Sequence, residues 1–326
     1  MDPLCHTLTG AALGRTGLQN RSRFALPTLI IAANLPDIDA VAYLVGGVDT
    51  VAIRRGVTHG IPALIILPLL LALVMKGLAM SLPGRAGKPE ADFRQLWLLS
   101  VIAMSTHPFL DFLNNYGMRW LMPFVDRWVY GDTLFIVDPI VWAMLLAGVV
   151  LAAKTSGIRQ PWWRQPAVAA LAVTTAYIAV SAGGTLLARN ATLAALPNDP
   201  PLRFMASPVF AQPLQRQLVL EYEQEYRLGT VHLLPGLPVE IEAEPLAKGD
   251  PADFGLAAGT RDGAIFLHWA RFPFIESRVV DDQHTLRIMD ARYVREWEGE
   301  EFGAVELNLV YPVANNEPFS RRRIKS

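Results

Sequence analysis

The sequence predicts a membrane all-α bundle of about five to six helices followed by a small antiparallel β domain. Long apolar runs fill the first half of the chain, charged residues are common from Asn198 onward, and the second half has short β-branched and aromatic runs between turn-like residues. We therefore expect a membrane domain at 1–190, a soluble β-rich domain at 198–320 and a basic tail at 321–326.

Composition narrows the classes of function. The 326 residues are 52% hydrophobic and 18% charged, with a formal net charge of −1, so no nucleic-acid partner is expected. Cys5 is the single cysteine and cannot form an intramolecular disulfide, so the fold does not depend on oxidation. The sequence shows neither a Walker-type glycine loop nor a Gly-x-Ser-x-Gly elbow.

Six apolar segments make up the expected bundle. A helix needs about 20 apolar residues to cross the hydrocarbon core of a bilayer. The clearest span is 60–82, where Lys76 is the only formal charge. The first segment is short and could be re-entrant or interfacial instead of spanning. The segments lie at residues 3–17, 24–46, 60–82, 95–115, 133–153 and 166–188.

Basic residues predict the orientation, because Lys and Arg are retained on the cytoplasmic side. Three short connections, at 15–23, 85–94 and 154–164, are rich in them and fall on one side if all six segments cross. We expect a multi-pass protein of the bacterial inner membrane whose C-terminal domain lies on the outer, periplasmic face. Four arginines expected on the outer side argue against this and are interpreted as site residues or interface anchors: Arg54, Arg55, Arg119 and Arg127.

Ionisable groups within the apolar half are the candidates for chemistry. Such groups are costly in a bilayer and usually face one another, a cavity or an ion. In the expected topology, five segments bring theirs to the same membrane face, and histidine with carboxylate is a suitable ligand set for a divalent metal. These groups are His6, Asp37, Asp39, His59, His107, Asp111, Asp132 and Asp138.

His107 and Asp111 are the pair whose spacing is most specific for a shared site. Residues at i and i+4 share one face of a helix, so this imidazole and carboxylate can reach one metal ion. They could equally form a hydrogen-bonded pair with a structural role.

Asp37 and Asp39 follow Pro36, which disfavours helix at Leu35 and predicts a break in the backbone. Broken backbone at membrane depth is tolerated where it lines a protein cavity. Two carboxylates spaced this way can ligate or bridge metal ions. Asp37 could instead cap the next helical turn.

His59 lies just ahead of a long apolar segment and is either a ligand or a surface residue. Arg55 can hold a phosphate or carboxylate of a substrate through two parallel hydrogen bonds, or it can anchor the chain at the interface. His6 is a ligand candidate only through its expected location beside the others.

Three further residues are candidates for a supporting role. Asp132 is expected to cap a helix, since aspartate is favoured at that position. Asp138 is expected to be an additional ligand or to orient a ligating imidazole. Asn115 could bind substrate or satisfy backbone groups at a helix end.

The second half predicts a sandwich or partial barrel. Turn-like residues such as Arg261-Asp262-Gly263 and Leu234-Pro235-Gly236 separate the runs. The expected strands are 217–222, 226–232, 239–242, 264–270, 275–280, 285–291 and 304–311.

Five motifs in the first 190 residues resemble a known family, at residues 1–10, 33–39, 55–60, 107–111 and 131–139. They are similar to those of bacterial membrane-bound, metal-dependent hydrolases, among them LexA-regulated inner-membrane proteins. That family is distantly similar to zinc-dependent phospholipases C. The resemblance implies a ligand set of His6, Asp37 or Asp39, His59, His107 and Asp111.

One departure limits the number of metal ions. The zinc phospholipases use further histidines after their His-x-x-x-Asp motif, whereas this chain has none between His107 and His232. We expect one or two ions instead of three, unless Asp132, Asp138 or Asn115 substitutes. Zinc is the expected metal, with manganese as the alternative.

The sequence therefore predicts a membrane-bound hydrolase that uses metal-activated water on a phosphoester in a lipid or lipid-linked substrate. Asp37, Asp39 and Arg55 are its expected catalytic residues. Two other functions are open: a metal or small-solute transporter, because intramembrane Asp and His also mark ion pathways, and a membrane scaffold whose β domain binds a partner.

Overall fold

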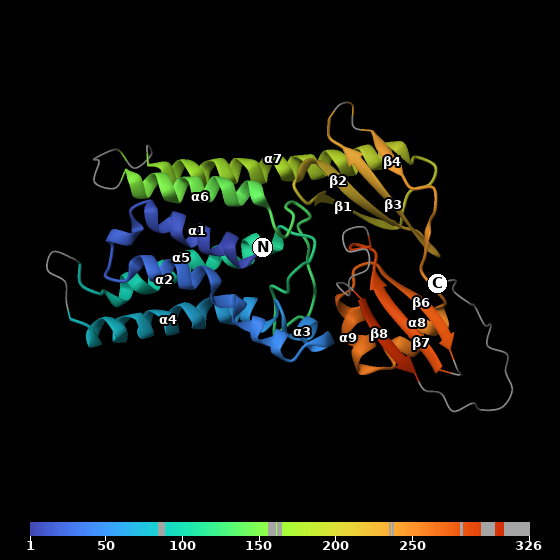
Figure 1. The fold of residues 1–326 in the computed structure, drawn as a ribbon, viewed down its shortest axis with the longest axis horizontal. Helices are drawn as coiled ribbons and strands as arrows, with labels where there is room; N and C mark the ends of the chain where they lie inside the picture. Colours follow the sequence, from blue (N-terminus) through green and yellow to red (C-terminus); the bar gives the residue numbers. More distant parts are fainter. Residues whose placement is uncertain are drawn as a thin grey trace. The chain divides into compact units, whose positions relative to one another are not determined.

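A computed structural model gives the fold and describes residues 1–83, 89–155, 161, 165–234, 236, 238–280, 283–294 and 304–309. It confirms a helical first half and antiparallel sheets from about residue 200 (Figure 1). The chain divides into a helical unit of residues 1–40, 55–189 and 207–216, and a second unit of residues 41–54, 190–206 and 217–326. The expected basic tail lies outside the described residues.

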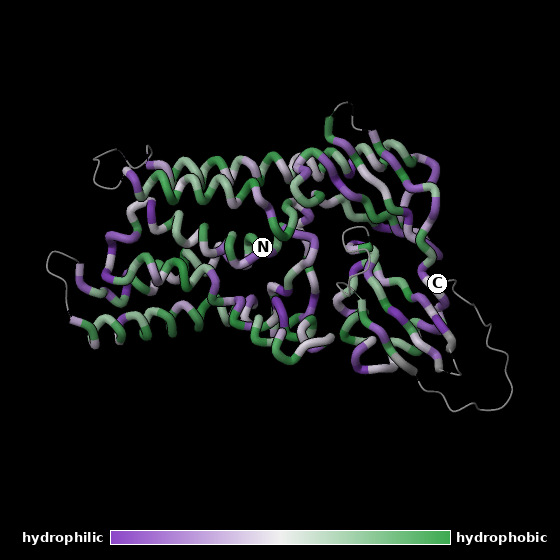
Figure 2. The backbone as a smooth tube through the Cα atoms, viewed as in Figure 1, coloured by the Kyte–Doolittle hydropathy of each residue, from purple (hydrophilic) through white to green (hydrophobic). Residues whose placement is uncertain are grey.

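Six α-helices of ten or more residues lie in the described part of the first 195 positions. Within the helical unit, α1 packs on α2 and α6, while α5 packs on α2 and α4. Apolar residues follow the length of α4, α6 and α7 (Figure 2). The helices are α1 (Pro3–Arg15), α2 (Ala25–Asn34), α4 (Ile61–Ser81), α5 (Phe93–Phe112), α6 (Pro139–Lys154) and α7 (Pro166–Ala195).

Three stretches of the described chain are long and apolar enough to cross a membrane: Ala25–Leu44, Ile61–Ser81 and Pro166–Ala195. The first consists of α2 and the 3₁₀ helix η2 (Leu35–Leu44) that follows it. Helix α6 is apolar but has only 16 residues, because it begins at Pro139 and not near 133 as expected. With 13 residues, α1 is too short to span as a helix by itself, in keeping with the interfacial alternative.

Asp2 fixes the start of α1. Its carboxylate accepts hydrogen bonds from the backbone N–H groups of Leu4 and Cys5, and Pro3 suits the first helical position. The indole Nε1 of Trp142 on α6 also donates to this carboxylate, at 3.0 Å. These contacts tie α1 to α6 and place His6 one turn into the bundle.

Two apolar clusters hold the helices together. Leu29 of α2, Met75 of α4 and Leu96 of α5 are buried in one of them. Leu8 of α1 and Leu145 of α6 are buried in the other, with the end of α5. Both clusters include α5, which is therefore the central helix of the bundle.

Small residues on α1 allow α2 to approach closely. A Cβ atom at Gly10 would lie 2.7 Å from the carbonyl oxygen of Leu29, and 3.0 Å from the Cβ of Ala33. Gly14, four residues on, faces the side chain of Leu26. This spacing is typical of closely packed membrane helices.

We expect Gly10→Ala to destabilise the folded protein by about 1–3 kcal/mol, because the added methyl must push α1 away from α2. Gly77→Ala on α4 is the matched control, since no atom lies within 4 Å of its added Cβ. That variant should be neutral or stabilising by up to about 1 kcal/mol. Thermal unfolding in detergent measures both. Equal stabilities for the two variants would contradict the close packing.

Two antiparallel sheets lie in the second unit, except for residues 207–216 at the β1–β2 turn, which belong to the helical unit. The first has the order β1-β2-β3-β4, with β5 also paired to β3, and the second has the order β6-β7-β8. Its buried core includes Met205, Val219, Tyr226, Phe272 and Phe274. The strands are β1 (Arg203–Val209), β2 (Gln212–Glu221), β3 (Glu225–His232), β4 (Val239–Ile241), β5 (Leu246–Ala247), β6 (Pro273–Val280), β7 (Gln283–Asp290) and β8 (Ala304–Leu309).

The strand expected at 264–270 is wrong, because this run lies in helix α9 (Arg261–Trp269). The hydroxyl of Thr260 caps the helix by accepting from the N–H of Gly263, so the expected turn there is the first helical turn. Phe266 and Trp269, three residues apart, are both buried on one face. Two further helices of this unit, α3 (Gly47–Ile53) and α8 (Pro251–Ala258), were not expected.

Candidate metal centre

Helix α5 supplies two of the predicted groups. His107 and Asp111 lie in its last two turns, and both are completely buried. Their shared face is confirmed: His107 Nε2 lies 3.6 Å from Asp111 Oδ2. The helical spacing read from the sequence therefore brings imidazole and carboxylate together.

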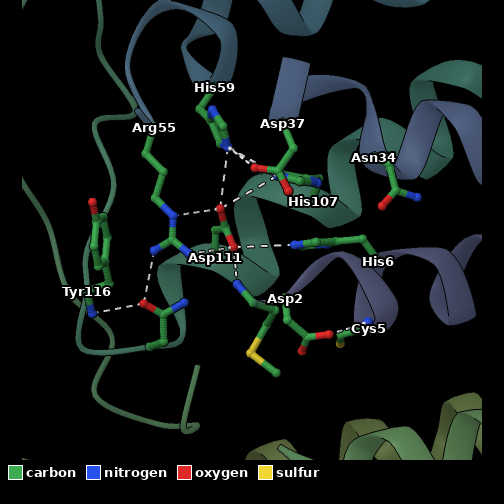
Figure 3. A network of polar contacts seen from close by, with 12 residues as sticks. Asp2, Cys5, His6, Asn34, Asp37, Arg55, His59, His107, Asp111 and Tyr116 are labelled. Carbon is green, nitrogen blue, oxygen red and sulfur yellow. Dashed lines mark hydrogen bonds and ion pairs between the residues drawn. The ribbon is translucent and has the colours of Figure 1, made fainter. Parts of the chain in front are cut away.

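The break predicted at Pro36 is also confirmed. Helix α2 ends at Asn34 and the chain continues as the 3₁₀ helix η2, which carries Asp37 in its first turn. The carboxylate of Asp37 faces the same point as His59 and His107 (Figure 3). Asp39 lies two residues further along the same turn and is buried, whereas Asp37 is only partly buried.

His59 reaches the site from the short 3₁₀ helix η3 (Val57–His59), immediately before α4. The next residue, Gly60, has no room for a side chain, because a Cβ there would collide with the carbonyl oxygen of Met122. This close approach holds the backbone beside His59 against the connection between α5 and α6. His59 itself is fully buried.

Four ligand atoms converge in the described part of the chain, from Asp37, His59, His107 and Asp111, and all lie within 4.8 Å of one another. The Nε2 atoms of His59 and His107 are 3.1 Å apart. Asp37 Oδ1 lies 3.9 Å from His59 Nε2 and 3.8 Å from His107 Nε2. Asp111 Oδ2 lies 3.4 Å from His59 Nε2.

These separations suit a single ion. Two donor atoms that are each about 2.0–2.2 Å from one zinc ion can lie at most about 4.4 Å apart. The separations of 3.1 to 3.9 Å between the two imidazole nitrogens, and between these nitrogens and the carboxylate oxygens, meet that limit. Two imidazoles and two carboxylates form a suitable donor set for zinc or manganese.

Hydrogen bonds on the far side of each imidazole turn Nε2 toward the cluster. His107 Nδ1 lies 2.7 Å from the carbonyl oxygen of Ala33, which can only accept, so Nδ1 carries the proton. His59 Nδ1 lies 3.2 Å from Asp39 Oδ2. Both neutral rings then present an unprotonated Nε2 to the cluster, as a metal ligand must.

Asp39 supports the orientation of the His59 ring. Its Oδ2 accepts hydrogen bonds from the Thr58 hydroxyl and from the backbone N–H of Arg55, each at 2.8 Å. The structure therefore separates the two predicted aspartates: Asp37 faces the cluster, and Asp39 orients His59.

Burial opposes protonation of His59, but hydrogen bonds to Asp111 and Asp39 outweigh it and raise the pKa of the ring above its ordinary value. A proton and a metal ion therefore compete for this imidazole.

Arg55 contacts Asp111 on both carboxylate oxygens: Nε lies 3.1 Å from Oδ2 and Nη2 lies 3.1 Å from Oδ1. Its Nη1 donates to the side chain of Asn114 and to the carbonyl of Gly117. The guanidinium also lies over the ring of Tyr116. Most of its donors are thus engaged by the protein, whereas the sequence predicts that they hold a substrate.

His6 lies on the other side of the cluster. Its ring stacks on that of His107 with centroids 3.7 Å apart, and its Nε2 is 3.4 Å from Asp111 Oδ1. The α-amino group of Met1 pairs with the same oxygen. The Nδ1 atom of His6 has no hydrogen-bond partner among the described residues, although the side chain is completely buried. Such a group is costly unless something binds it.

None of the three expected supporting residues is among the four converging groups. Asp138, and not Asp132, caps α6 by accepting from the N–H groups of Ile140 and Val141. The carbonyl of Asp132 accepts from the hydroxyl of Thr185. Asn115 is buried beyond the end of α5, and its neighbour Asn114 accepts a hydrogen bond from Arg55.

Three partners of the site were not predicted from the sequence: the carbonyl of Ala33, the hydroxyl of Thr58 and the α-amino group of Met1. Backbone groups cannot be identified as partners from residue types. Thr58 is next to His59, but its role depends on contacts between distant segments.

Comparison with known proteins places the helical half in a family. A family model described as "YdjM inner membrane protein" matches residues 1–186, more than half of the chain. An "Uncharacterized protein YfhP" of Bacillus subtilis (strain 168) is 31% identical over 163 residues. That alignment covers 46% of this chain and 46% of the relative, so the two correspond over about half of their lengths. No solved structure matches.

Proposed function

We propose that this chain, which belongs to the YdjM inner membrane protein family, is a metal-dependent hydrolase of a phosphoester in a lipid or lipid-linked substrate. The observation that carries the proposal is the convergence of four ligand atoms within 4.8 Å from three separate segments of the apolar half. Buried ionisable groups in membrane proteins are rare and usually functional.

In this proposal, Asp37, His59, His107 and Asp111 hold one divalent ion. A bound ion of this kind supplies a water of near-neutral pKa and polarises the phosphoryl oxygen. Asp39 and the carbonyl of Ala33 keep the two imidazoles in the required tautomer.

A second ion is proposed for His6. Asp111 directs Oδ2 toward His59 and His107, while its Oδ1 faces His6. His6 and Asp111 would hold this second ion, since one carboxylate can serve two ions. The buried Nδ1 of His6, for which the described residues provide no hydrogen-bond partner, supports this arrangement.

Membrane location suits a lipid substrate. We propose a multi-pass topology in which the ends of the helices that carry the cluster lie at the outer face of the inner membrane, with the C-terminal domain on that side. Single cysteines at Ser81 and Asn198 test this in cells with a membrane-impermeant thiol reagent. Labelling of position 198 and protection of position 81 are expected, and the reverse pattern would overturn the orientation.

The activity is tested with purified protein and phospholipid vesicles. We expect release of a phosphorylated headgroup or of phosphate that stops on chelation and resumes with added zinc or manganese. Substitution of His107 should abolish it, whereas Gly77→Ala, on the outside of α4, should leave it unchanged. Metal-dependent ion uptake into proteoliposomes without hydrolysis would favour the transporter instead.

A further inference from the structure

The connection between α5 and α6 carries a short tip, residues 121–127, whose apolar side chains are largely exposed. Phe124 is 75% exposed, and Leu121 and Val125 are 46% and 47% exposed. Grouped, exposed apolar side chains of this size usually mark an interaction surface.

The tip is an ordered turn. The backbone N–H groups of Phe124 and Val125 both donate to the carbonyl of Leu121, at 2.9 and 3.1 Å. A β-bridge between Met118 and Val129 closes its base. The turn thus satisfies its own backbone and directs its apolar side chains outward.

The same connection is fastened to the beginning of α4 and to the metal centre. The N–H of Ile61 donates to the carbonyl of Trp120 at 3.3 Å. The N–H of Arg119 donates to the carbonyl of Arg55, the residue that pairs with Asp111, at 3.2 Å. The tip therefore lies at the end of α4 where the cluster is.

The exposed apolar residues of helix α4 indicate that lipid covers this surface. The helix is one of the stretches apolar and long enough to span a membrane, and its outward residues are bare, with Ile65 65% and Val74 64% exposed. Ile61, in its first turn, is also exposed. An apolar surface thus runs from the middle of α4 to its first turn, and the tip continues it.

We propose that residues 121–127 insert into the boundary between headgroups and acyl chains of the leaflet in which α4 begins, and so seat the metal centre at the lipid surface. Phe and Leu are typical of the apolar side that interfacial segments bury at this depth. The exposed Arg127 would face lipid phosphates. This lipid contact rests on the membrane placement of α4 and holds or fails independently of hydrolysis.

An environment-sensitive fluorophore on a single cysteine tests the contact in lipid nanodiscs. The label is placed at Phe124 in a Cys5→Ala background. Val74, in the middle of α4, gives the reference for deep lipid, and the exposed Glu244 gives the reference for water. Nitroxide lipids with the quencher at the headgroup or deep in the chain report the depth.

At position 124 we expect an emission maximum to the blue of that at 244, and stronger quenching by the headgroup nitroxide than by the deep one. The label at 74 should show the opposite preference. Emission and quenching like those at 244 would overturn the proposal. A blue-shifted label that no lipid quencher reaches would also overturn it, by showing that protein covers the tip.

Discussion

Asp111→Asn should lower the affinity for zinc or manganese by more than about 100-fold, beyond the 10–100-fold effect typical of residues that only support a ligand. Asp111 lies within 3.6 Å of both ligating imidazoles, and its Oδ1 also lies 3.4 Å from His6 Nε2. The measurement is metal content after dialysis against metal of known free concentration.

Asp138→Asn is the matched control, since the substitution is the same and asparagine caps a helix as well as aspartate does. Asp138 caps α6 and accepts from the hydroxyl of Tyr177, away from the four converging groups. Its metal content should equal that of the unaltered protein. Loss of metal on Asp138→Asn would return this residue to the ligand set.

Asp39→Asn should lower the affinity for metal less than Asp111→Asn and more than Asp138→Asn, because Asp39 orients His59 without facing the cluster. We expect about a 10–100-fold loss of affinity with no change in the number of ions at saturation. Equal losses for Asp39→Asn and Asp111→Asn would contradict the separation of roles.

Asp111→Asn also leaves Arg55 without its carboxylate, so a folding defect could lower metal content indirectly. His107→Gln removes a ligand and keeps the charge balance. A folded His107→Gln protein that keeps full metal content would overturn the site.

The sequence was sufficient to predict the site's main residues, because helical spacing and a proline break are local properties. His107 and Asp111 share a face of any helix, and Pro36 disfavours helix at the residue before it. Which of Asp37 and Asp39 faces the cluster was not predictable. A 3₁₀ helix turns about 120° per residue, so carboxylates two residues apart point in different directions.

Other differences have equally local causes. The run 264–270 is too short for its hydrophobic periodicity to distinguish a strand from a helix. The N-cap at Thr260 favours a helix. Pro139 was a stronger sign of the start of α6 than Asp132, since proline is favoured at the first helical position. The engagement of Arg55 with Asp111 joins residues 56 positions apart, which no local pattern reveals.

Arg55→Met should destabilise the metal-free protein by about 3–5 kcal/mol, the typical cost of breaking a buried ion pair. Arg55 is 2% exposed and contacts both oxygens of the completely buried Asp111. Methionine keeps an apolar stem of similar length but removes the charge. The free energy of unfolding in detergent, measured after chelation, reports the loss.

Added metal should restore much of this stability, because an ion on Asp111 replaces the lost positive charge. By linkage, a ligand that binds only the folded state stabilises it, so the variant's melting temperature should rise more steeply with metal than that of the unaltered protein. Its affinity for the ion should also increase, since Arg55 no longer competes for the same oxygens.

Arg119→Met provides the comparison. Arg119 is also buried, but its carboxylate partner Asp126 has a side chain that is 46% exposed, so water can solvate that charge when the arginine is lost. The cost should be smaller and independent of metal. If Arg55→Met instead loses its metal as Asp111→Asn is expected to, then Arg55 holds Asp111 in its ligating position and does not compete with the ion.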